Sequence, residues 1–368
     1  MTKIRAIAYY LPQFHPVPEN DLWWGKGFTE WTNVVKAKPL FKGHIQPKLP
    51  ADLGFYDLRL PEVREQQAEL AKYAGIEGFC YWHYWFGNGK QILERPFNEV
   101  LSTGKPDFPF CLGWANHSWT GVWYGAPNRM LIEQKYPGLD DIEEHFYNLL
   151  PAFKDKRYIT VDDKPLLLIF QPREIPNVKD FVSFFNELAI KNGLKGIHFV
   201  ASNVGMYANP NEFGMDAMTY PCQENIINHY TPLFLRVKRK IFKNDQLKKI
   251  YRLIDKKPIN KFKYEHALKY LVSNENYDFN YYHTILSGWD NSPRSGENAI
   301  ILTDFNVDKF RVHVKDILSK TLQNKQKVVF IKSWNEWAEG NYLEPDLLNG
   351  TSLIEVLRSE IEKANNLL

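Results

Sequence analysis

The fold follows from one stretch near the C-terminus, which reads Val328-Val329-Phe330-Ile331-Lys332-Ser333-Trp334-Asn335-Glu336-Trp337-Ala338-Glu339-Gly340. Its first part is a β-branched and aromatic run, which is typical of a buried strand. The run then gives way to two carboxylates three positions apart, flanked by tryptophans, and Gly340 allows the backbone to turn. A buried strand that ends in paired acids beside aromatic rings indicates a catalytic site, with faces on which a sugar ring can stack.

Seven similar apolar runs precede this one along the 368 residues, and most are followed by a helix-like segment. The runs cover residues 4–10, 78–85, 110–116, 165–171, 196–203, 217–221 and 282–290. Eight such strands predict an α/β fold, a (β/α)8 barrel of the TIM type, formed as a single domain by residues 1–368. The runs are apolar on both faces, as barrel strands should be. A doubly wound open sheet is the alternative, but no strand is followed by G-x-G-x-x-G.

The predicted strands end in polar or aromatic side chains. These are Gln13, His83, Asn116, Gln171, Asn203, Tyr220, Asp290 and Glu336. In a barrel of this kind the chemistry lies at the carboxyl ends of the strands, so we expect these side chains to surround one site.

Residues 222–280, between the sixth and seventh strands, form an unusually long insertion. Its part from 232 to 270 carries 13 Lys and Arg against 3 Asp and Glu, an excess of 10 positive charges. A basic amphipathic helix can lie on an anionic membrane or on a lipid-linked pyrophosphate; the alternative is a solvated helical lid. In either case the insertion is predicted to rim the active face.

Composition narrows the possible partners and the cellular compartment of the protein. The net charge of +3 does not indicate a nucleic-acid partner. The three cysteines, Cys80, Cys111 and Cys222, give no disulfide framework and suit a reducing compartment. The first apolar run is too short for a signal peptide, and no stretch is long and apolar enough to span a bilayer. We therefore expect a cytoplasmic protein, peripheral at the inner membrane face if the basic insertion binds lipid.

Glu336 and Glu339 are the candidate catalytic pair. Cleavage of a glycoside typically needs two carboxyl groups with separate roles, one protonated and one ionised. On a continuing strand, two residues three positions apart point to opposite faces. The strand must therefore end by about Trp334 for both acids to reach one site. The alternatives are that the segment is an acidic surface loop, or that Glu344 and Asp346, further along it, serve instead or bind substrate hydroxyls.

Further polar and aromatic side chains are predicted to bind substrate, by hydrogen bonds to hydroxyls or by stacking. They are Tyr10, Gln13, His15, Trp24, Glu30, His83, Trp114, Asn116, His117, Trp119, Asn203, Tyr220, Trp289, Asp290, Trp334, Asn335, Trp337 and Glu344. A purely structural role is the alternative for the residues after the third strand, and His83 suits a core histidine equally well. No H-E-x-x-H motif or close His/Cys cluster occurs, so we expect no metal and no cofactor. The absence of D-x-D weighs against a transferase that uses nucleotide sugars.

Four motifs carry a resemblance to a known family. They are Ala8-Tyr9-Tyr10-Leu11-Pro12-Gln13-Phe14-His15, residues 23–33, Gly288-Trp289-Asp290-Asn291-Ser292-Pro293-Arg294 and the stretch from Ser333 to Pro345. Together they resemble the WbsX-type glycosyltransferases, a family related to glycoside hydrolase family 99, which contains endo-α-mannosidases and endo-α-mannanases. The likeness covers nearly the whole chain.

The resemblance implies a barrel, a metal-free site and retention of configuration through a 1,2-anhydro sugar. Glu336 would deprotonate the substrate 2-hydroxyl, and Glu339 would protonate the leaving oxygen and later activate the acceptor. His117 departs from the pattern, because WbsX-type chains usually carry a carboxylate there, and this affects contacts to the sugar at that subsite.

Three functions follow as hypotheses. The first is cleavage of an α-linked sugar in a bacterial surface polysaccharide or its precursor. The second is a glycosyltransferase of O-antigen, lipopolysaccharide or capsule assembly. The third is a glycan-binding barrel without catalysis, which the acid pair disfavours because binding alone does not need it.

Overall fold

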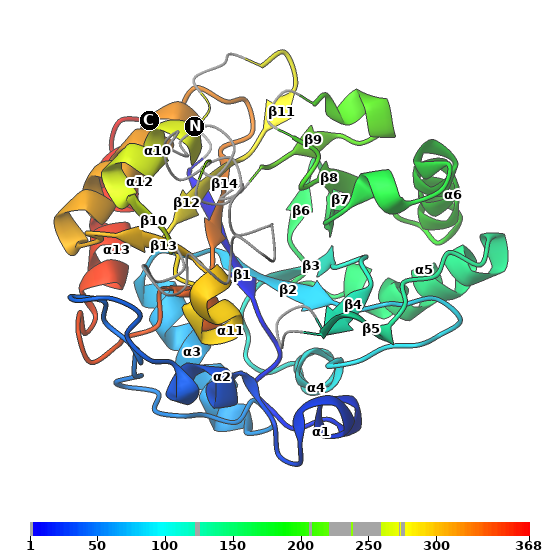
Figure 1. Cartoon of the computed structure of the whole chain (residues 1–368). Helices are drawn as coiled ribbons and strands as arrows, with labels where there is room; N and C mark the ends of the chain where they lie inside the picture. The colour runs from blue at the N-terminus through cyan, green and yellow to red at the C-terminus, as the bar shows by residue number, and fades with distance from the viewer. Residues whose placement is uncertain are drawn as a thin grey trace.

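The computed structural model describes residues 3–121, 126–205, 208–220, 237, 259–271, 273 and 277–368. A ring of strands lies at the centre of the molecule and helices surround it (Figure 1). The first strand, β1 (Arg5–Tyr10), lies between β2 (Gly78–His83) and β14 (Val328–Lys332), and both pairings are parallel. The two ends of the chain therefore meet in the middle of the sheet.

The sheet closes into a barrel. Its order runs from β1 through β2, β3 (Phe110–Trp114), β7 (Lys164–Ile169), β8 (His198–Ala201) and β9 (Ala217–Met218) to β11 (Asn280–Tyr281), and from β1 through β14 to β12 (His283–Leu286). Only Tyr282 separates β11 from β12, so one interrupted strand pairs with β9 at its start and with β14 at its end. Counted as one, β11 and β12 complete eight parallel positions, and the predicted (β/α)8 barrel is confirmed. A short β6 (Thr160–Val161) pairs antiparallel with β7.

The outer layer consists of amphipathic helices that begin and end at residues suited to those positions. Pro61 opens α3 (Pro61–Tyr73), where its missing N–H costs nothing, and Gly104 in a left-handed conformation ends α4 (Arg95–Thr103). The other long helices are α5 (Leu139–Phe153), α6 (Val178–Lys191), α12 (Val307–Thr321) and α13 (Ser352–Asn365).

Aromatic side chains fill the core on both sides of the sheet. Tyr9 stacks on Trp82 and Phe330 inside the barrel, with ring centroids 5.1 and 5.2 Å apart. Outside it, Phe146 of α5 meets Phe185 of α6 at 5.3 Å. Burying one such side chain stabilises the fold by about 1.5–3 kcal/mol, so this double core fixes the strand ends that carry the site.

The connections after the strands contain structure that the sequence patterns did not predict. They include α1 (Pro18–Trp24), α2 (Glu30–Lys36), the hairpin β4 (Trp119–Gly121) and β5 (Ala126–Ile132), the parallel pair β10 (Asn260–Lys263) and β13 (Ile300–Thr303), α10 (Tyr264–Leu271) and the one-turn α11 (Ser292–Ser295). The 3-10 turns are η2 (Pro172–Glu174), η3 (Pro210–Phe213), η4 (Gly296–Asn298) and η5 (Trp337–Glu339), and β15 (Asn335–Glu336) pairs with β16 (Asn341–Tyr342). These pieces are too short to show a clear period.

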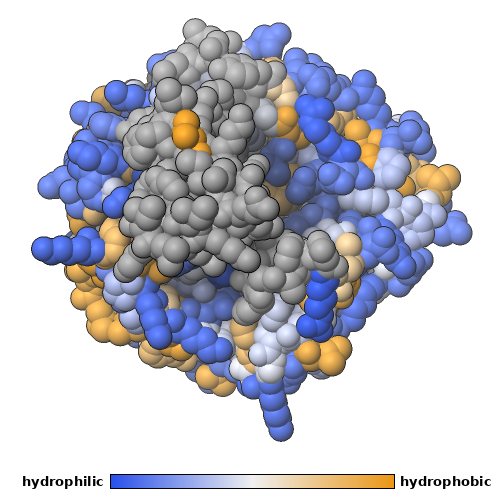
Figure 2. Space-filling view, viewed as in Figure 1, coloured by the Kyte–Doolittle hydropathy of each residue, from blue (hydrophilic) through white to orange (hydrophobic). Residues whose placement is uncertain are grey.

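Most of the predicted basic insertion, residues 222–258 apart from 237, lies outside the described residues. Its position at the active face and its binding to lipid therefore stay predictions. Hydrophilic side chains predominate over the described part of the face in Figure 2. In the described part of the chain, we find no helix with the length and apolar character needed to cross a bilayer.

Candidate active site

A cavity of about 820 Å³ opens at the carboxyl ends of the strands. Side chains that follow β1, β2, β3, β7, β8, β12 and β14 line it. Its wall contains Gln13, Trp24, Glu30, Trp82, Tyr84, His117, Trp119, Phe170, Gln171, Asn203, Trp289, Arg294, Lys332, Ser333, Glu336 and Glu339, among others. The predicted location of the site is thus where the structure has a cleft.

The local fold explains how Glu336 and Glu339 reach the same cleft. Strand β14 ends at Lys332, before Trp334, as this arrangement requires. The chain then pairs β15 with β16 and turns through η5, so the two acids no longer alternate as on a strand. Gly340 closes the turn at φ 63°.

Close packing at Gly340 holds this turn against the loop after β12. A Cβ atom on Gly340 would lie 2.9 Å from the backbone N and O atoms of Asp290, too close for any other residue. The Asp290 N–H donates to the Glu339 carbonyl oxygen at 2.7 Å. The Asp290 carboxylate accepts hydrogen bonds from His44 Nε2 at 2.8 Å and Gln46 Nε2 at 2.6 Å. Asp290 therefore anchors the turn that carries Glu336 and Glu339.

One guanidinium joins three carboxylates in the cleft. Arg294 Nη1 lies 2.7 Å from Glu339 Oε1, and Arg294 Nη2 lies 3.4 Å from Glu336 Oε2. The same Nη2 atom lies 3.0 Å from Glu30 Oε2. The contacts are unequal, because Glu339 and Glu30 pair closely with the cation and Glu336 only loosely.

The electrostatics separate the two candidate acids. Burial, followed by the charge of Glu339, raises the pKa of Glu336 to about 8, although Arg294 acts in the opposite direction. Burial also opposes the charge of Arg294, but Glu30, Glu336 and Glu339 raise its pKa well above the usual range. The raised pKa favours the protonated form of Glu336 at neutral pH, whereas Arg294 stays charged and pairs closely with Glu339.

The cleft also offers aromatic rings and uncharged polar groups. Trp119 packs edge-on against Tyr84 at 5.2 Å, and Trp82 packs between Tyr9 and Phe170. Burial lowers the pKa of His117 to about 4, so its imidazole is neutral at physiological pH. Such a wall suits a sugar, whose ring stacks on an aromatic face while its hydroxyls form hydrogen bonds.

The structure brings nine of the predicted site residues to the cleft. They are Gln13, Trp24, Glu30, His117, Trp119, Asn203, Trp289, Glu336 and Glu339.

The other predicted residues do not line it, and several of them hold the loops of the site in place. Asn335 bonds the Leu11 backbone through both its oxygen and its amide nitrogen, and Asn116 does the same to Gln171. His83 bonds His145 in the barrel wall at 2.9 Å. The remaining residues outside the lining are Tyr10, His15, Trp114, Tyr220, Asp290, Trp334, Trp337 and Glu344.

Arg294 is the most important residue that the sequence patterns did not assign to the site. Trp82, Tyr84, Phe170, Lys332 and other lining residues were missed as well. For Arg294 a signal existed, because it closes the motif that starts at Gly288 after the seventh strand. A cation in a loop at the carboxyl end of a barrel strand is a candidate partner for acids there.

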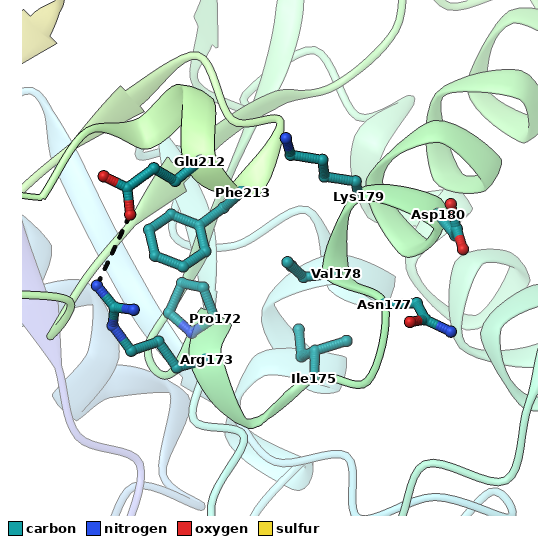
Figure 3. Close-up of a pocket in the computed structure, with 9 residues that line it drawn as sticks. All are labelled: Pro172, Arg173, Ile175, Asn177, Val178, Lys179, Asp180, Glu212 and Phe213. Carbon is teal, nitrogen blue, oxygen red and sulfur yellow. Dashed lines mark ion pairs between the residues drawn. The ribbon is translucent and has the colours of Figure 1, made fainter.

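A second cavity of about 520 Å³ lies between η2, the start of α6 and η3. Figure 3 shows Arg173 and Glu212 facing each other at its edge, 3.9 Å apart, with Phe213 beside them. Its two acids, Asp180 and Glu212, are exposed, so this cavity has no counterpart to the buried carboxylate cluster.

Among the described residues, no group of three or more His, Cys, Asp and Glu side chains is placed to hold a metal ion.

A (β/α)8 barrel with buried paired carboxyls in an aromatic-walled cleft is typical of a carbohydrate-active enzyme, and comparison with known proteins agrees. The family model "Glycosyltransferase WbsX" matches residues 6–357. The chain belongs to this family.

Relatives and solved structures add detail. The chain is 35% identical over 371 residues to the "Uncharacterized protein WxcX" of two strains of Xanthomonas campestris pv. campestris. The match covers 97% of this chain and 50% of the relative, so the chain spans about half its length.

The barrel is similar to a family 99 endo-alpha-mannosidase from Bacteroides thetaiotaomicron, with a TM-score of 0.59, 13% identity and 99% of each chain covered. A "Glycoside hydrolase-like protein" gives a TM-score of 0.59 at 14% identity, over 98% of this chain and 94% of that one. At these identities the likeness shows the fold.

Proposed function

We propose that this barrel cleaves an α-linked sugar in a bacterial surface polysaccharide or its precursor, with retention of configuration. The observation that carries the proposal is the pair Glu336 and Glu339, which share Arg294 in an aromatic-walled cleft. Residues 1–368 act as one catalytic barrel in this proposal, and residues 222–280 rim its active face.

The proposed reaction has two balanced steps. Glu336 takes the proton of the sugar 2-hydroxyl, O2 attacks C1, and Glu339 protonates the departing oxygen, which yields a 1,2-anhydro sugar. Glu339 then takes a proton from the acceptor as the acceptor attacks C1, and Glu336 returns its proton to O2. Each acid ends where it began, as a retaining mechanism requires.

The free site differs from the reacting one in the position of a single proton. At neutral pH the proton is on Glu336, and Glu339 is paired with Arg294. The reaction starts from the form in which Glu339 holds the proton and Arg294 faces an ionised Glu336. Because Arg294 already touches both carboxyls, this exchange needs only a small displacement of the guanidinium.

A glycosyltransferase is the second candidate, and the description of the matching family favours it. A sugar hydroxyl would replace water as the acceptor in the same second step. The excess of 10 positive charges in residues 232–270 would then hold a lipid-pyrophosphate-linked acceptor at the cytoplasmic membrane face.

The test uses α-linked polysaccharides and lipid-linked oligosaccharides, each with and without nucleotide sugars, and measures new reducing ends and released nucleotide. Reducing ends formed without nucleotide sugar support a hydrolase, and nucleotide release that depends on acceptor supports the transferase. Glu336→Gln and Glu339→Gln should each lower turnover by about 10²–10⁴-fold. Glu62→Gln, on the exposed side of α3, is the matched control. Full turnover in Glu336→Gln would refute the assignment of the pair.

A further inference from the structure

A second carboxylate, Glu344, is buried behind the catalytic loop and fully occupied by protein donors. It is 2% exposed. Gln67 Nε2 of α3 donates to Glu344 Oε1 at 2.6 Å. Tyr56 OH and Trp337 Nε1 both donate to Glu344 Oε2, at 2.8 and 2.6 Å. With three donors and no place in the cleft lining, Glu344 is not arranged to meet a substrate.

What Glu344 holds is the segment between the two catalytic acids. Trp337 follows Glu336 directly and begins η5, which ends at Glu339. Its indole stacks on Tyr342 with ring centroids 3.8 Å apart, so the ring can rotate little. The indole N–H can only donate, and its bond to a carboxylate is of the strong, charge-assisted kind. The direction in which η5 presents both acids therefore depends on this bond.

We propose that Glu344 is a positioning residue, whose buried carboxylate fixes the Trp337 indole and thereby the orientation of Glu336 and Glu339. The inference rests on the proposed function for that pair. Gln67 extends the network, since Tyr10 OH donates to Gln67 Oε1 at 2.6 Å. Strand β1 and helix α3 are thus tied to the catalytic loop through one side chain.

A glutamine at position 344 would keep the shape and remove the charge. Its single oxygen can still accept from Trp337, but the bond becomes neutral and weaker. Its amide would face the Gln67 amide, which can turn over to accept. We therefore expect Glu344→Gln to fold and to hold Trp337 more loosely. The matched control is Asp346→Asn, because Asp346 is equally buried on the same loop and bonds Tyr342 OH instead of the indole.

The experiment is carried out at pH 8, where Glu344 is ionised because its pKa is about 7. It measures the indole ¹H–¹⁵N resonance of Trp337, assigned with Trp337→Phe, together with kcat and KM for the saccharide that the wild-type protein turns over. In Glu344→Gln the indole proton should move upfield and kcat should fall by roughly 10- to 100-fold, with KM unchanged, as misplacement of reacting groups predicts. Asp346→Asn should leave the indole resonance in place. An unmoved resonance, or an unchanged kcat, in Glu344→Gln overturns the proposal.

Tyr56→Phe provides a second test of opposite sign. Because Tyr56 OH shares Oε2 with the indole, its removal should strengthen the Trp337 bond and move the proton downfield. This variant remains informative if Glu344→Gln does not fold, and an upfield or absent shift counts against the proposal. If no saccharide is turned over and Glu336→Gln behaves like the wild type, the proposed function fails, and the two indole shifts still decide whether Glu344 holds Trp337.

Discussion

The charge of Glu30 should set the pH at which the site works. Glu30 is 3% exposed and pairs with Arg294, so it competes with Glu336 for the same cation. Its charge also raises the pKa of Glu336, though less than burial and Glu339 do. Replacing it by glutamine keeps the volume, removes the repulsion and frees Arg294 for Glu336. Both changes favour the ionised form of Glu336, so Glu30→Gln should lower its pKa.

The distances give the size of the effect. Glu30 Oε2 and Glu336 Oε2 lie 3.0 and 3.4 Å from the same Nη2 atom, so at most 6.4 Å separates them. At an effective dielectric constant of about 20, two unit charges at this distance repel by about 2.6 kcal/mol. This corresponds to about 1.9 pKa units. Since the glutamine dipole restores part of the field, we expect the pKa of Glu336 to fall by about 1–2 units.

The assay is the pH dependence of kcat/KM, which reports the ionisation of the free enzyme. Because the reacting form carries one proton, on Glu339, kcat/KM of the wild type should fall as the pH rises through about 8 and the pair loses that proton. The falling limb of Glu30→Gln should lie about 1–2 units lower, so at pH 9 the variant should retain at least about tenfold less of its own plateau than the wild type does. Asn33→Asp is the reciprocal control, because Asn33 touches Glu30 and a new charge there should move the limb upward.

Two results would contradict this reasoning. A limb at the same pH in wild type and Glu30→Gln would show that Glu30 does not control the proton. A wild-type kcat/KM that keeps rising as the pH passes through about 8 would show that the pair works without this proton, and Glu339 could not then be the acid.

Two further predictions concern stability, measured by urea unfolding. Gly340→Ala should destabilise the fold by about 1–3 kcal/mol, because the added Cβ clashes with the backbone at a position that already has a positive φ. The control Gly104→Ala has a similar φ but open space around the Cβ, so it should destabilise the fold less. Equal losses of stability would show that the contact with Asp290 is unimportant. The free energy of unfolding should be greatest near pH 6.5. Below that pH, buried histidines with lowered pKa values bind protons mainly in the unfolded state, so stability rises with pH up to their unfolded pKa. Above it, stability falls, because burial raises the pKa of Glu336 to about 8 and of Glu344 to about 7, and the folded state loses the protons that these groups hold. The histidines are His15, His83, His117, His145, His198, His283 and His313. A decline above pH 6.5 that persists in the double variant Glu336→Gln, Glu344→Gln would contradict this account.

The barrel was predictable because its strands are apolar on both faces. That pattern can be recognised in the sequence without knowing which strands pair. The interrupted strand was not predictable in detail. The sequence predicts one strand over 282–290, whereas the chain starts pairing at Asn280, breaks at Tyr282 and ends at Leu286, before Gly288 turns at φ 104°. Where a strand changes partners depends on barrel closure, which is a property of the whole sheet.

The location of the candidate site could be predicted from the sequence, but only some of the residues that line it could. The rule that the site lies at the carboxyl ends of the strands predicts the correct end of the barrel. It does not predict which side chains enter the site, because successive side chains face opposite sides of the sheet. Tyr9 therefore enters the barrel, and Tyr10 next to it reaches Gln67 of α3. Arg294 was not predicted as a site residue because its partners are distant in the sequence; Glu30, for example, lies 264 positions before it. Only the folded chain shows that these charges meet.

The charges in the cleft explain why one proton belongs to the site. Three carboxyls, on Glu30, Glu336 and Glu339, face Arg294, and the charge of Lys332 also acts on Glu336. Three negative charges against two positive ones become neutral when one proton is added, and a net charge in a buried cleft is costly. The loosely paired Glu336 is the acid that can take this proton with the smallest loss of ion pairing. Acid–base cleavage of a glycoside needs one mobile proton between two carboxyls, and the third carboxylate, Glu30, is what retains it near neutral pH. For this reason the removal of Glu30, which pairs with Arg294, is expected to change the pH dependence of the reaction.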